Sequence, residues 1–483
     1  MQRADPQAER FLDRPYASVQ LLLLAAAGLL GFGVLMAVST TIAASHDATG
    51  SNAQSIWTQV IKEAEFIAIG VPIFWFALRL SPRVYRVLAY PMLVIGVAAL
   101  VAVLVPGIGF GVFGARRWID LGPMQLQPSE FAKVGVLLWG ADLLARKQQL
   151  GTLRRARHLF LPLVPGVALV AALVMLEPDL GTTSCYMLIL LGLLWMVGMP
   201  WRYFGFLVSL IAGGMLLLAF SAPYRWQRIT SFTHPFKDAR NTGFHAVQGI
   251  YALASGGVFG VGLGQGTSKY GWVPNANSDY VFAIIGQELG LLGCLAVLAL
   301  FAVFAYTSLR VARRSADPFV RLVAGASAVW ICGQAVINIG YVTGLLPVTG
   351  IPLPFISAGG TSLLASFFVL GMLVSFARHE APAVSAARRD ERLGRRSRLQ
   401  RWLRIPVPKQ YAPPKRRASV AVAGRRRPVV PSNRRAAPRT APTPAAKPAA
   451  KSAPGSLRQA SARTARGATP LRATGTDGPR RAR

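Results

Sequence analysis

Long apolar stretches recur along the first 380 residues and are separated by short polar segments. A helix needs about 20 apolar residues to cross the roughly 30 Å hydrocarbon core of a bilayer. Strand-like alternation is absent, which argues against a transmembrane barrel. The predicted fold is therefore an all-α polytopic membrane protein. Its expected transmembrane helices span residues 17–40, 58–80, 84–105, 128–145, 158–176, 181–200, 202–220, 279–309, 320–344 and 361–378.

The composition also indicates that most of this chain is embedded in a lipid bilayer. Hydrophobic residues make up 53% of its 483 positions and charged residues only 15%, which leaves too little polar surface for a soluble protein of this size. The first apolar stretch lacks a cleavage site of small residues and other stretches follow it, so a retained helix is expected. Cys185, Cys294 and Cys332 lie within predicted spans, and no Cys or His cluster has the spacing of a metal site.

The distribution of Lys and Arg between alternate loops predicts how the helices are oriented, because basic residues favour the cytoplasmic side. One set of loops, which includes the N-terminal segment 1–16, holds 16 basic residues, and the opposite set holds 7. The richer set also includes the C-terminus, so both termini are expected in the cytoplasm. Asp279, at the start of the span 279–309, is then extracytoplasmic.

Two segments outside the predicted spans stand out. The outer loop at 221–278 is too long for a simple turn, and its glycine run GGVFGVGLGQG misses the pattern of a nucleotide-binding loop. A tightly turning packed loop is favoured there. The segment 381–483 is rich in Ala, Pro and Ser and holds 27 Lys and Arg against 3 acids. It predicts a disordered cytoplasmic tail that contacts anionic lipid, an acidic partner or solvent alone, and not nucleic acid.

Few acidic residues lie within or beside the predicted spans. Glu130 and Lys133 are three residues apart on one helical face, which predicts a structural ion pair. Asp179, in the sequence EPDLGT, either caps the following helix or faces a substrate. Glu288 is nine residues beyond Asp279 and about half a turn out of phase on a helix, so these two acids are not expected to form a paired-carboxylate site.

Asp279 has two interpretations. It is either the N-cap of the helix that follows or a base that accepts a hydroxyl proton at the outer surface. Basic residues in the outer loop favour the second, because cations would hold an anionic diphosphate leaving group. Contact with lipid headgroups is the alternative for these cations, which are Arg225, Arg228, Lys237, Arg240 and Lys269.

Several segments, in order along the chain, resemble the SEDS family of shape, elongation, division and sporulation proteins, which includes FtsW and RodA. The stretch LLWGADLLARK and the basic tail look more like the division branch than the elongation branch. The matching segments are GARRWIDLGPMQLQPSEFAKV (114–134), EPDLGT (177–182), YRWQRITSF (224–232), GGVFGVGLGQGTSK (256–269), SDYVFAIIGQELG (278–290) and GLLPVTGIPLPFISAGGTS (344–362).

The resemblance implies a peptidoglycan glycosyltransferase that polymerises lipid II into a growing glycan strand outside the cytoplasmic membrane. It implies a class B penicillin-binding protein transpeptidase as partner and a division septum as location. Asp279 matches the family's essential acid and would be the catalytic base. A lipid II flippase, an elongation polymerase and a scaffold remain alternatives. The resemblance specifies no cofactor, and a divalent cation, Mg or Mn, bound with the diphosphate is the candidate.

Other residues match the family's motifs and are expected to bind substrate or to shape its site. Departures from the motifs include Asn275, Gln287 and His245, and the first two positions therefore supply no acid. The expected substrate-binding residues are Arg117, Lys133, Arg225, Arg228, Lys269, Asp179, Ser357, Gly359 and Gly360, with Gln127 and Glu130 beside them.

Overall fold

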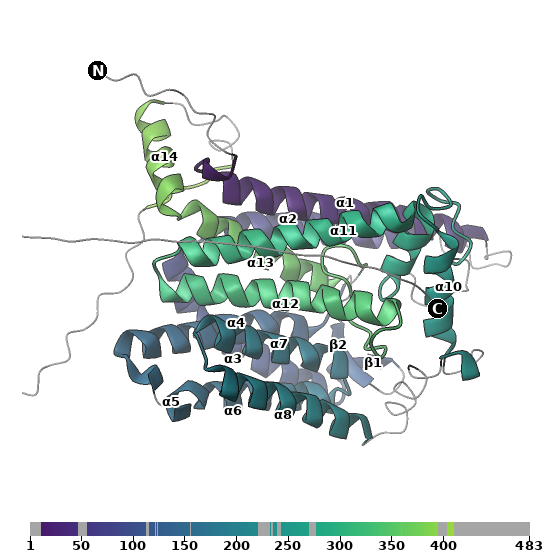
Figure 1. The fold of residues 1–483 in the computed structure, drawn as a ribbon, viewed down its shortest axis with the longest axis horizontal. Helices are drawn as coiled ribbons and strands as arrows, with labels where there is room; N and C mark the ends of the chain where they lie inside the picture. The colour runs from purple at the N-terminus through teal and green to yellow at the C-terminus, as the bar shows by residue number, and fades with distance from the viewer. Residues whose placement is uncertain are drawn as a thin grey trace, which may run out of the picture. The chain divides into compact units, whose positions relative to one another are not determined.

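Helices occupy all ten predicted apolar stretches in the computed structural model (Figure 1). The structure describes residues 11–46, 56–112, 115–120, 122, 124–154, 156–220, 232, 235–238, 243–269, 277–358, 360–394 and 403–409. The long helices are α1 (Ala17–His46), α2 (Ile56–Arg79), α3 (Pro82–Leu104), α4 (Pro128–Leu150), α6 (Leu163–Leu176), α7 (Leu180–Met196), α8 (Trp201–Phe220), α11 (Val281–Arg314), α12 (Pro318–Val342) and α13 (Thr361–Arg378).

Shorter elements connect or extend these helices. The stretch predicted at 158–176 is divided into α5 (Ala156–Phe160) and α6, with Leu161 and Pro162 between them. The others are η1 (Phe11–Asp13), η2 (Thr152–Arg154), η3 (Pro235–Asp238), α10 (Phe244–Ser255) and α14 (Ala381–Arg392).

Seven helices in the described part of the chain are long and apolar enough to cross a membrane. This result confirms a helical multi-pass membrane protein. Helix α7 has only 17 residues, and α2 and α4 carry charges such as Glu63 and Asp142. The number of ten spans therefore remains a prediction.

A small antiparallel sheet interrupts the otherwise helical fold between α3 and α4. Strands β1 (Gly109–Val112), β2 (Ala115–Asp120) and β3 (Gln125–Leu126) pair in the order β1-β2-β3, with Ile119 opposite Leu126. In Figure 1 the sheet and α10 lie at the same end of the helices, on the right, which we call the site end. Helix α14 lies at the opposite end, which we call the tail end.

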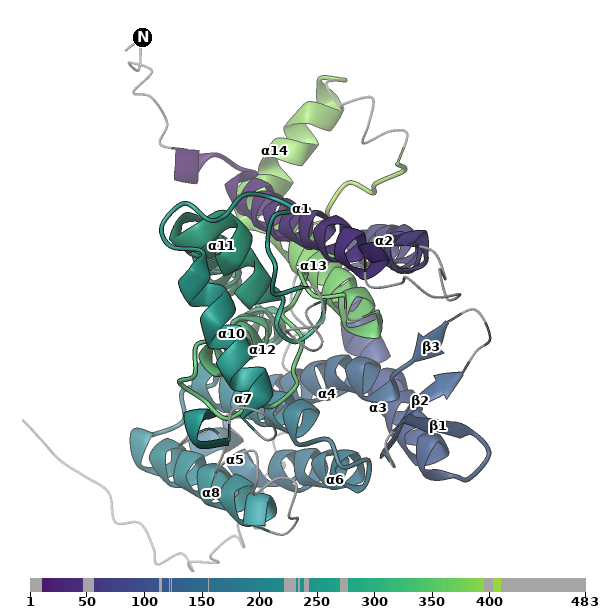
Figure 2. The ribbon, with the colours of Figure 1, turned by 90° about the vertical axis from the view of Figure 1, so that its right-hand side faces the viewer.

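Helix α13 lies at the centre of the bundle. It contacts α1, α2, α4, α11 and α12, and 89% of its most apolar stretch is buried, against 6% for α8. Figure 2 looks along the helices from the site end and shows α13 between α2 and α4. Helix α8 is therefore the more lipid-facing of the two.

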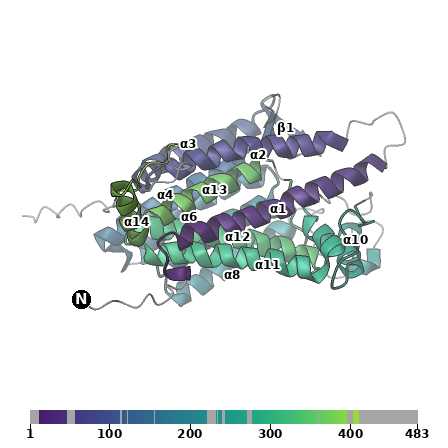
Figure 3. The same ribbon diagram turned by 90° about the horizontal axis from the view of Figure 1, so that it is seen from above.

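Small residues let neighbouring helices approach closely. A Cβ atom on Gly96 of α3 would stand 2.9 Å from the Cα of Ala132 in α4, and one on Gly135 of α4 would stand 2.9 Å from the carbonyl oxygen of Met92. Either side chain would force α3 and α4 apart. Figure 3 shows α3 above α4 and α13 in this packing.

The glycine run of the outer loop explains a break in α11. Gly290 has non-helical backbone angles (φ 66°, ψ −163°), which interrupts the hydrogen-bond ladder of the helix. The loop supplies the missing partners. The amides of Val261 and Gly262 donate to the carbonyls of Gln287 and Glu288, and the amide of Leu291 donates to the carbonyl of Gly257. The run is a packed loop, as its glycines predict.

The first residues of the C-terminal tail are helical, whereas the sequence predicts disorder there. Disorder is expected from residue 381, but residues 381–392 form α14, whose Ala383 and Val384 are buried. Residues 403–409 also have a described position, and the Leu403 carbonyl accepts a hydrogen bond from Trp75 of α2 at 3.0 Å. The tail beyond residue 409 lies outside the described residues.

Candidate functional site

Asp279 lies in a turn at the site end, directly before α11. The helix starts at Val281 and its N-cap position belongs to Tyr280, so Asp279 stands one residue outside the helix. Its side chain is half-buried. The carboxylate oxygen Oδ2 lies 3.6 Å from the place where a Cβ atom of Gly350 would stand. The connection between α12 and α13 therefore passes directly beside this carboxylate.

The connection from α12 to α13 holds the turn that carries Asp279. The Ser357 hydroxyl donates to the carbonyl of Ser278 at 2.5 Å and accepts the amide of Leu353 at 2.7 Å. Ser357 is buried, so its hydroxyl orders the site from within instead of lining its surface. Gly360 precedes α13 with a φ of 48°, and a Cβ there would stand 3.0 Å from the ring of Phe66. The neighbouring Gly359 lies outside the described residues.

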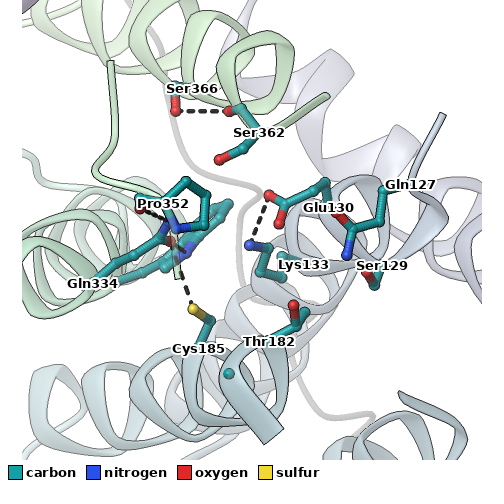
Figure 4. A network of polar contacts seen from close by, with 12 residues as sticks. Gln127, Ser129, Glu130, Lys133, Thr182, Cys185, Gln334, Pro352, Ser362 and Ser366 are labelled. Carbon is teal, nitrogen blue, oxygen red and sulfur yellow. Dashed lines mark hydrogen bonds and ion pairs between the residues drawn. The ribbon is translucent and has the colours of Figure 1, made fainter. Parts of the chain in front are cut away.

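Glu130 and Lys133 form a buried ion pair on α4, with 2.7 Å between Nζ and Oε2. Figure 4 shows the Lys133 ammonium directed at Glu130, between α4, α7, α12 and α13. The ammonium also lies 5.3 Å from the centre of the Trp330 ring. A buried charge needs such partners. Lys133 was also expected to bind substrate, but here its charge is neutralised inside the bundle.

Figure 4 also shows a polar network around this pair. Gln334 of α12 accepts a hydrogen bond from Trp330 at 3.0 Å and donates to the carbonyl of Pro352 at 2.9 Å. Ser362 of α13 lies beside Glu130 in the same view. The interior of the bundle is thus polar where α4, α7, α12 and α13 meet, and Gln334 joins it to the loop after α12.

Asp179 caps α7, which is one of its two predicted roles. Its carboxylate accepts the Thr182 amide and the Thr182 hydroxyl, both at 2.9 Å, as a helix N-cap does. Gln127 donates to the same carboxylate at 3.4 Å. Asp179 is 8% exposed, so the other predicted role, contact with a substrate, has little surface available.

Arg117 braces the same turn from strand β2. Its guanidinium donates to the carbonyl of Glu177 at 2.9 Å and to the carbonyl of Pro178 at 2.6 Å. It also approaches the Asp179 carboxylate at 3.8 Å. Because 32% of the Arg117 side chain is exposed, this residue ties the small sheet to the start of α7 while part of its surface remains accessible.

Glu177 is a buried acid that the sequence did not single out as functional. The residue is fully buried, and neither carboxyl oxygen has a hydrogen-bond partner among the described residues. Burial, followed by the nearby Asp179 carboxylate, raises the pKa of Glu177 to about 8, while Arg117 acts in the opposite direction. The group is therefore mainly protonated at neutral pH.

Lys269 differs from its predicted role in diphosphate binding. Its ammonium is buried and lies 2.7 Å from Glu288 of α11 and 2.7 Å from the Ser39 hydroxyl of α1. It also donates to the carbonyl of Gly264 at 2.9 Å. Lys269 and Glu288 thus form a structural ion pair that fastens the glycine loop to two helices.

The structure describes only some of the other basic residues that were expected to hold the diphosphate. Arg225, Arg228 and Arg240 lie outside the described residues, and Lys237 is an exposed residue of η3. The described residues contain no group of three or more His, Cys, Asp or Glu side chains that would hold a metal ion. Asp279 is the carboxylate that the family resemblance implies as the base, and a single carboxylate offers a divalent cation at most two protein oxygens.

Comparisons with known proteins agree with the motifs. The family model described as a cell cycle protein, FtsW/RodA/SpoVE, matches residues 20–381. A probable peptidoglycan glycosyltransferase FtsW of Mycobacterium tuberculosis is 45% identical over 406 residues, which cover 84% of this chain and 75% of the relative. Stage V sporulation protein E of Bacillus subtilis is 37% identical over 314 residues, which cover 65% of this chain and 85% of the relative.

Solved structures share the fold. A chain of a peptidoglycan synthase complex that coordinates polymerization and crosslinking matches with a TM-score of 0.60 and 26% identity, over 74% of this chain and 97% of that chain. The rod shape determining protein RodA of Thermus thermophilus matches with a TM-score of 0.54 and 23% identity, over 78% of this chain and 99% of that chain. These matches confirm the resemblance that the motifs indicate, and the chain belongs to the FtsW/RodA/SpoVE family of cell cycle proteins.

Proposed function

We propose that this chain is a peptidoglycan glycosyltransferase that polymerises lipid II at the outer face of the cytoplasmic membrane. The observation that carries the proposal is the placement of Asp279, a half-buried carboxylate in a turn at the site end, beside Gly350. The names of the relatives support the reaction, and the charge distribution of the loops supports an outward-facing site end.

In the proposed reaction the Asp279 carboxylate is the general base. It accepts the proton of the 4-hydroxyl group of the acceptor sugar, and the hydroxyl oxygen forms a bond with the anomeric carbon of the lipid-linked chain. The bond between that carbon and the diphosphate breaks, and undecaprenyl diphosphate leaves with the electron pair. One displacement converts an α-linked diphosphate into a β-1,4 link, so no covalent intermediate with the protein is needed.

The leaving diphosphate needs positive charge. Because Lys133 and Lys269 are buried in ion pairs with Glu130 and Glu288, we assign this role to Arg225 and Arg228 of the outer loop. A divalent cation bound to the diphosphate would share this role with the two arginines. It would supply electrostatic stabilisation of the departing negative charge.

The proposed setting is the division septum, with both termini in the cytoplasm. Division-type motifs and relatives named FtsW support this location. A class B penicillin-binding protein is the proposed partner, because the similar solved chain comes from a complex that coordinates polymerization with crosslinking. The basic tail is proposed to contact anionic lipid or an acidic division protein.

The test is polymerisation of fluorescent lipid II by the purified full chain with its partner transpeptidase, read as a glycan ladder on a gel. Asp279→Asn removes the proton acceptor at nearly constant shape and is expected to lower the rate by at least about a hundredfold. Asp120→Asn is the matched control, because Asp120 is an exposed acid of β2 at the same end of the bundle. It should polymerise at the parental rate.

Two outcomes would contradict the proposal. Polymerisation by Asp279→Asn at the parental rate would exclude this carboxylate as the base. Transfer of lipid II between leaflets that survives Asp279→Asn, with no glycan formed by the parent protein, would instead identify a flippase. The buried pair of Glu130 and Lys133 would then become the first candidate for a transport site.

A further inference from the structure

Asn338 and Tyr341 of α12 bind the backbone of Asp279 itself. The Asn338 side-chain nitrogen Nδ2 lies 3.0 Å from the Asp279 carbonyl oxygen, and the Tyr341 hydroxyl lies 3.0 Å from the same oxygen. Both side chains also bind the carbonyl of Ile351, at 2.7 and 2.9 Å. We infer that Asn338, supported by Tyr341, is a positioning residue that sets the direction of the Asp279 carboxylate; this inference rests on the proposed function.

Three side-chain hydrogens serve this cluster, and the buried Asn338 oxygen Oδ1 has no hydrogen-bond partner among the described residues. The amide of Asn338 has two hydrogens and the phenol of Tyr341 has one, which gives three donors. The acceptors are the carbonyls of Asp279 and Ile351 and the oxygen of Tyr341, which lies 2.7 Å from Nδ2. Asn338 and Tyr341 are fully buried. Because both side chains are buried, loss of either one leaves the carbonyl of Asp279 or of Ile351 short of a donor, which is costly away from water.

The two preceding carbonyls are held from the same part of the chain. The carbonyl of Asn277 accepts the amide of Ala358 at 3.0 Å, and the carbonyl of Ser278 accepts the hydroxyl of Ser357 at 2.5 Å. Three consecutive carbonyls before α11 are thus bound by α12 or by the loop that follows it. The bonds made by α12 reach residue 279 itself.

A general base must lie within hydrogen-bond reach of the proton it accepts, and a displacement of about 1 Å costs up to about a hundredfold in rate. The carbonyl and the carboxylate of Asp279 are both attached through its Cα atom. If the carbonyl loses its hydrogen bonds, the backbone can move and the carboxylate changes direction with it. The bound turn instead keeps Oδ2 beside Gly350. Loss of the Asn338 amide is therefore expected to affect the chemical step more than the binding of substrate.

The experiment measures kcat and KM for lipid II with Asn338→Leu, which keeps the number and branching of side-chain heavy atoms and removes both donors. We expect kcat to fall between about tenfold and a hundredfold, with KM within about twofold of the parent. Gln334→Leu is the matched control. Gln334 lies one turn earlier on α12, is buried, and donates to the carbonyl of Pro352 at 2.9 Å, not to Asp279. It should keep kcat within about threefold.

Tyr341→Phe provides a second variant, since it removes one hydroxyl and keeps the ring. It should lower kcat several-fold and lower the thermal midpoint only by the small amount expected for one buried hydrogen bond. In an Asp279→Glu background, where the carboxylate is already displaced, Asn338→Leu should cause a smaller loss than in the parent. If the two losses of kcat do not add in this way, Asn338 acts by positioning Asp279 and not by stabilising the protein in general.

Three results would overturn the inference. One is a parental kcat in folded Asn338→Leu or Tyr341→Phe protein, and another is a rise in KM with no fall in kcat. The third is an equal fall in kcat in the Asn338 and Gln334 variants. These results leave the proposed function intact if Asp279→Asn is inactive. Parental activity of Asp279→Asn would overturn the proposed function itself, whatever the Asn338 variants do.

Discussion

At the scale of single residues, the site end contains two buried acids that differ in their hydrogen bonding. Asp179 has its carboxylate satisfied by Thr182 and Gln127. Glu177, two residues earlier, has no hydrogen-bond partner among the described residues and is fully buried. An ionised carboxylate is costly in such a place, so Glu177 is held as the neutral acid. The same turn therefore combines a hydrogen-bonded helix cap with a neutral core residue.

The raised pKa of Glu177 predicts a pH dependence of stability. The folded protein keeps the proton up to about pH 8, whereas the unfolded chain loses it near pH 4.5. The folded state thus binds more protons between these values, and the contribution of Glu177 to stability is complete below pH 4.5 and falls as the pH rises towards 8. Glu177→Gln has no proton to lose and should be free of this decline.

Thermal unfolding in detergent at pH 5 and pH 8 measures the effect. The midpoint of Glu177→Gln relative to the parent should be higher at pH 8 than at pH 5. Asp120→Asn, which changes an exposed acid of β2, serves as the control and should show no such difference. Equal pH dependence of the parent and the Gln variant would mean that Glu177 is ionised in the folded protein.

At the scale of elements, the broken helix α11 and the glycine loop form one unit. The break at Gly290 frees backbone groups of the helix, and the loop residues 257–262 bind them. The ion pair of Lys269 and Glu288 adds a second fastening between the same two segments. Asp279 lies directly before α11, so this unit supports the helix that follows the Asp279 turn.

Two glycines of the loop allow a matched test of this packing. Gly260 and Gly264 both have positive φ angles, 83° and 78°. A Cβ on Gly260 would stand 2.1 Å from the carbonyl oxygen of Glu288, whereas one on Gly264 would meet nothing within 4 Å. Gly264→Ala is expected to cost about 1 kcal/mol from backbone strain. Gly260→Ala should cost about 1–3 kcal/mol more, because the loop must move away from α11.

The comparison of thermal midpoints of the two variants in the same detergent checks this prediction. Gly260→Ala should also lower polymerisation, since the displaced loop no longer supports the start of α11. Equal midpoints for the two variants would show that the loop is not packed against the helix in the membrane protein.

Elements were easier to predict from the sequence than their interruptions. Each apolar stretch gave a helix, because burial in lipid depends on local composition. The break in α11 was not predicted, since Gly290 lies in an apolar run and its backbone partners belong to the loop at 257–262. The small sheet at 109–126 was missed because its strands are short and show no alternation.

The candidate site was predictable only where its contacts are local. The cap formed by Asp179 and Thr182 and the pair of Glu130 and Lys133 involve neighbours three residues apart, which a helical pattern reveals. The binding of Asp279 by Asn338 spans 59 residues. No pattern in a single sequence predicts such a contact, so Asn338 was not among the expected site residues.

At the scale of the whole molecule, a network of ion pairs joins helices that are distant in sequence. At the tail end, Arg86 of α3 binds Asp142 of α4 at 3.3 Å and Asp317, the N-cap of α12, at 3.0 Å. Arg146 also binds Asp142, at 2.7 Å. These pairs join three helices at the end away from Asp279. The tail end is therefore a structural anchor of the bundle.

The first part of the C-terminal tail belongs to this anchor. The Pro406 carbonyl accepts a hydrogen bond from Arg378 of α13 at 2.6 Å, and Ile405 packs against the hydrophobic core. The Leu403 carbonyl binds Trp75. Together these contacts fasten residues 403–409 to α2 and α13. The composition of the tail as a whole gave no sign of this docked segment, because its short apolar run LRIPVPK lies among basic, Ala, Pro and Ser residues.

Two truncations separate the docked segment from the rest of the tail. A chain that ends after residue 410 keeps all these contacts and should retain the parental thermal midpoint. A chain that ends after residue 394 loses two hydrogen bonds and the burial of Ile405, which should cost about 1–4 kcal/mol. Both should polymerise lipid II in vitro below their midpoints, because the site end is intact, and both should localise less well in cells, because the basic charge is lost. Loss of polymerisation in the chain that ends after residue 410 would instead show that the distal tail acts on the catalytic turn.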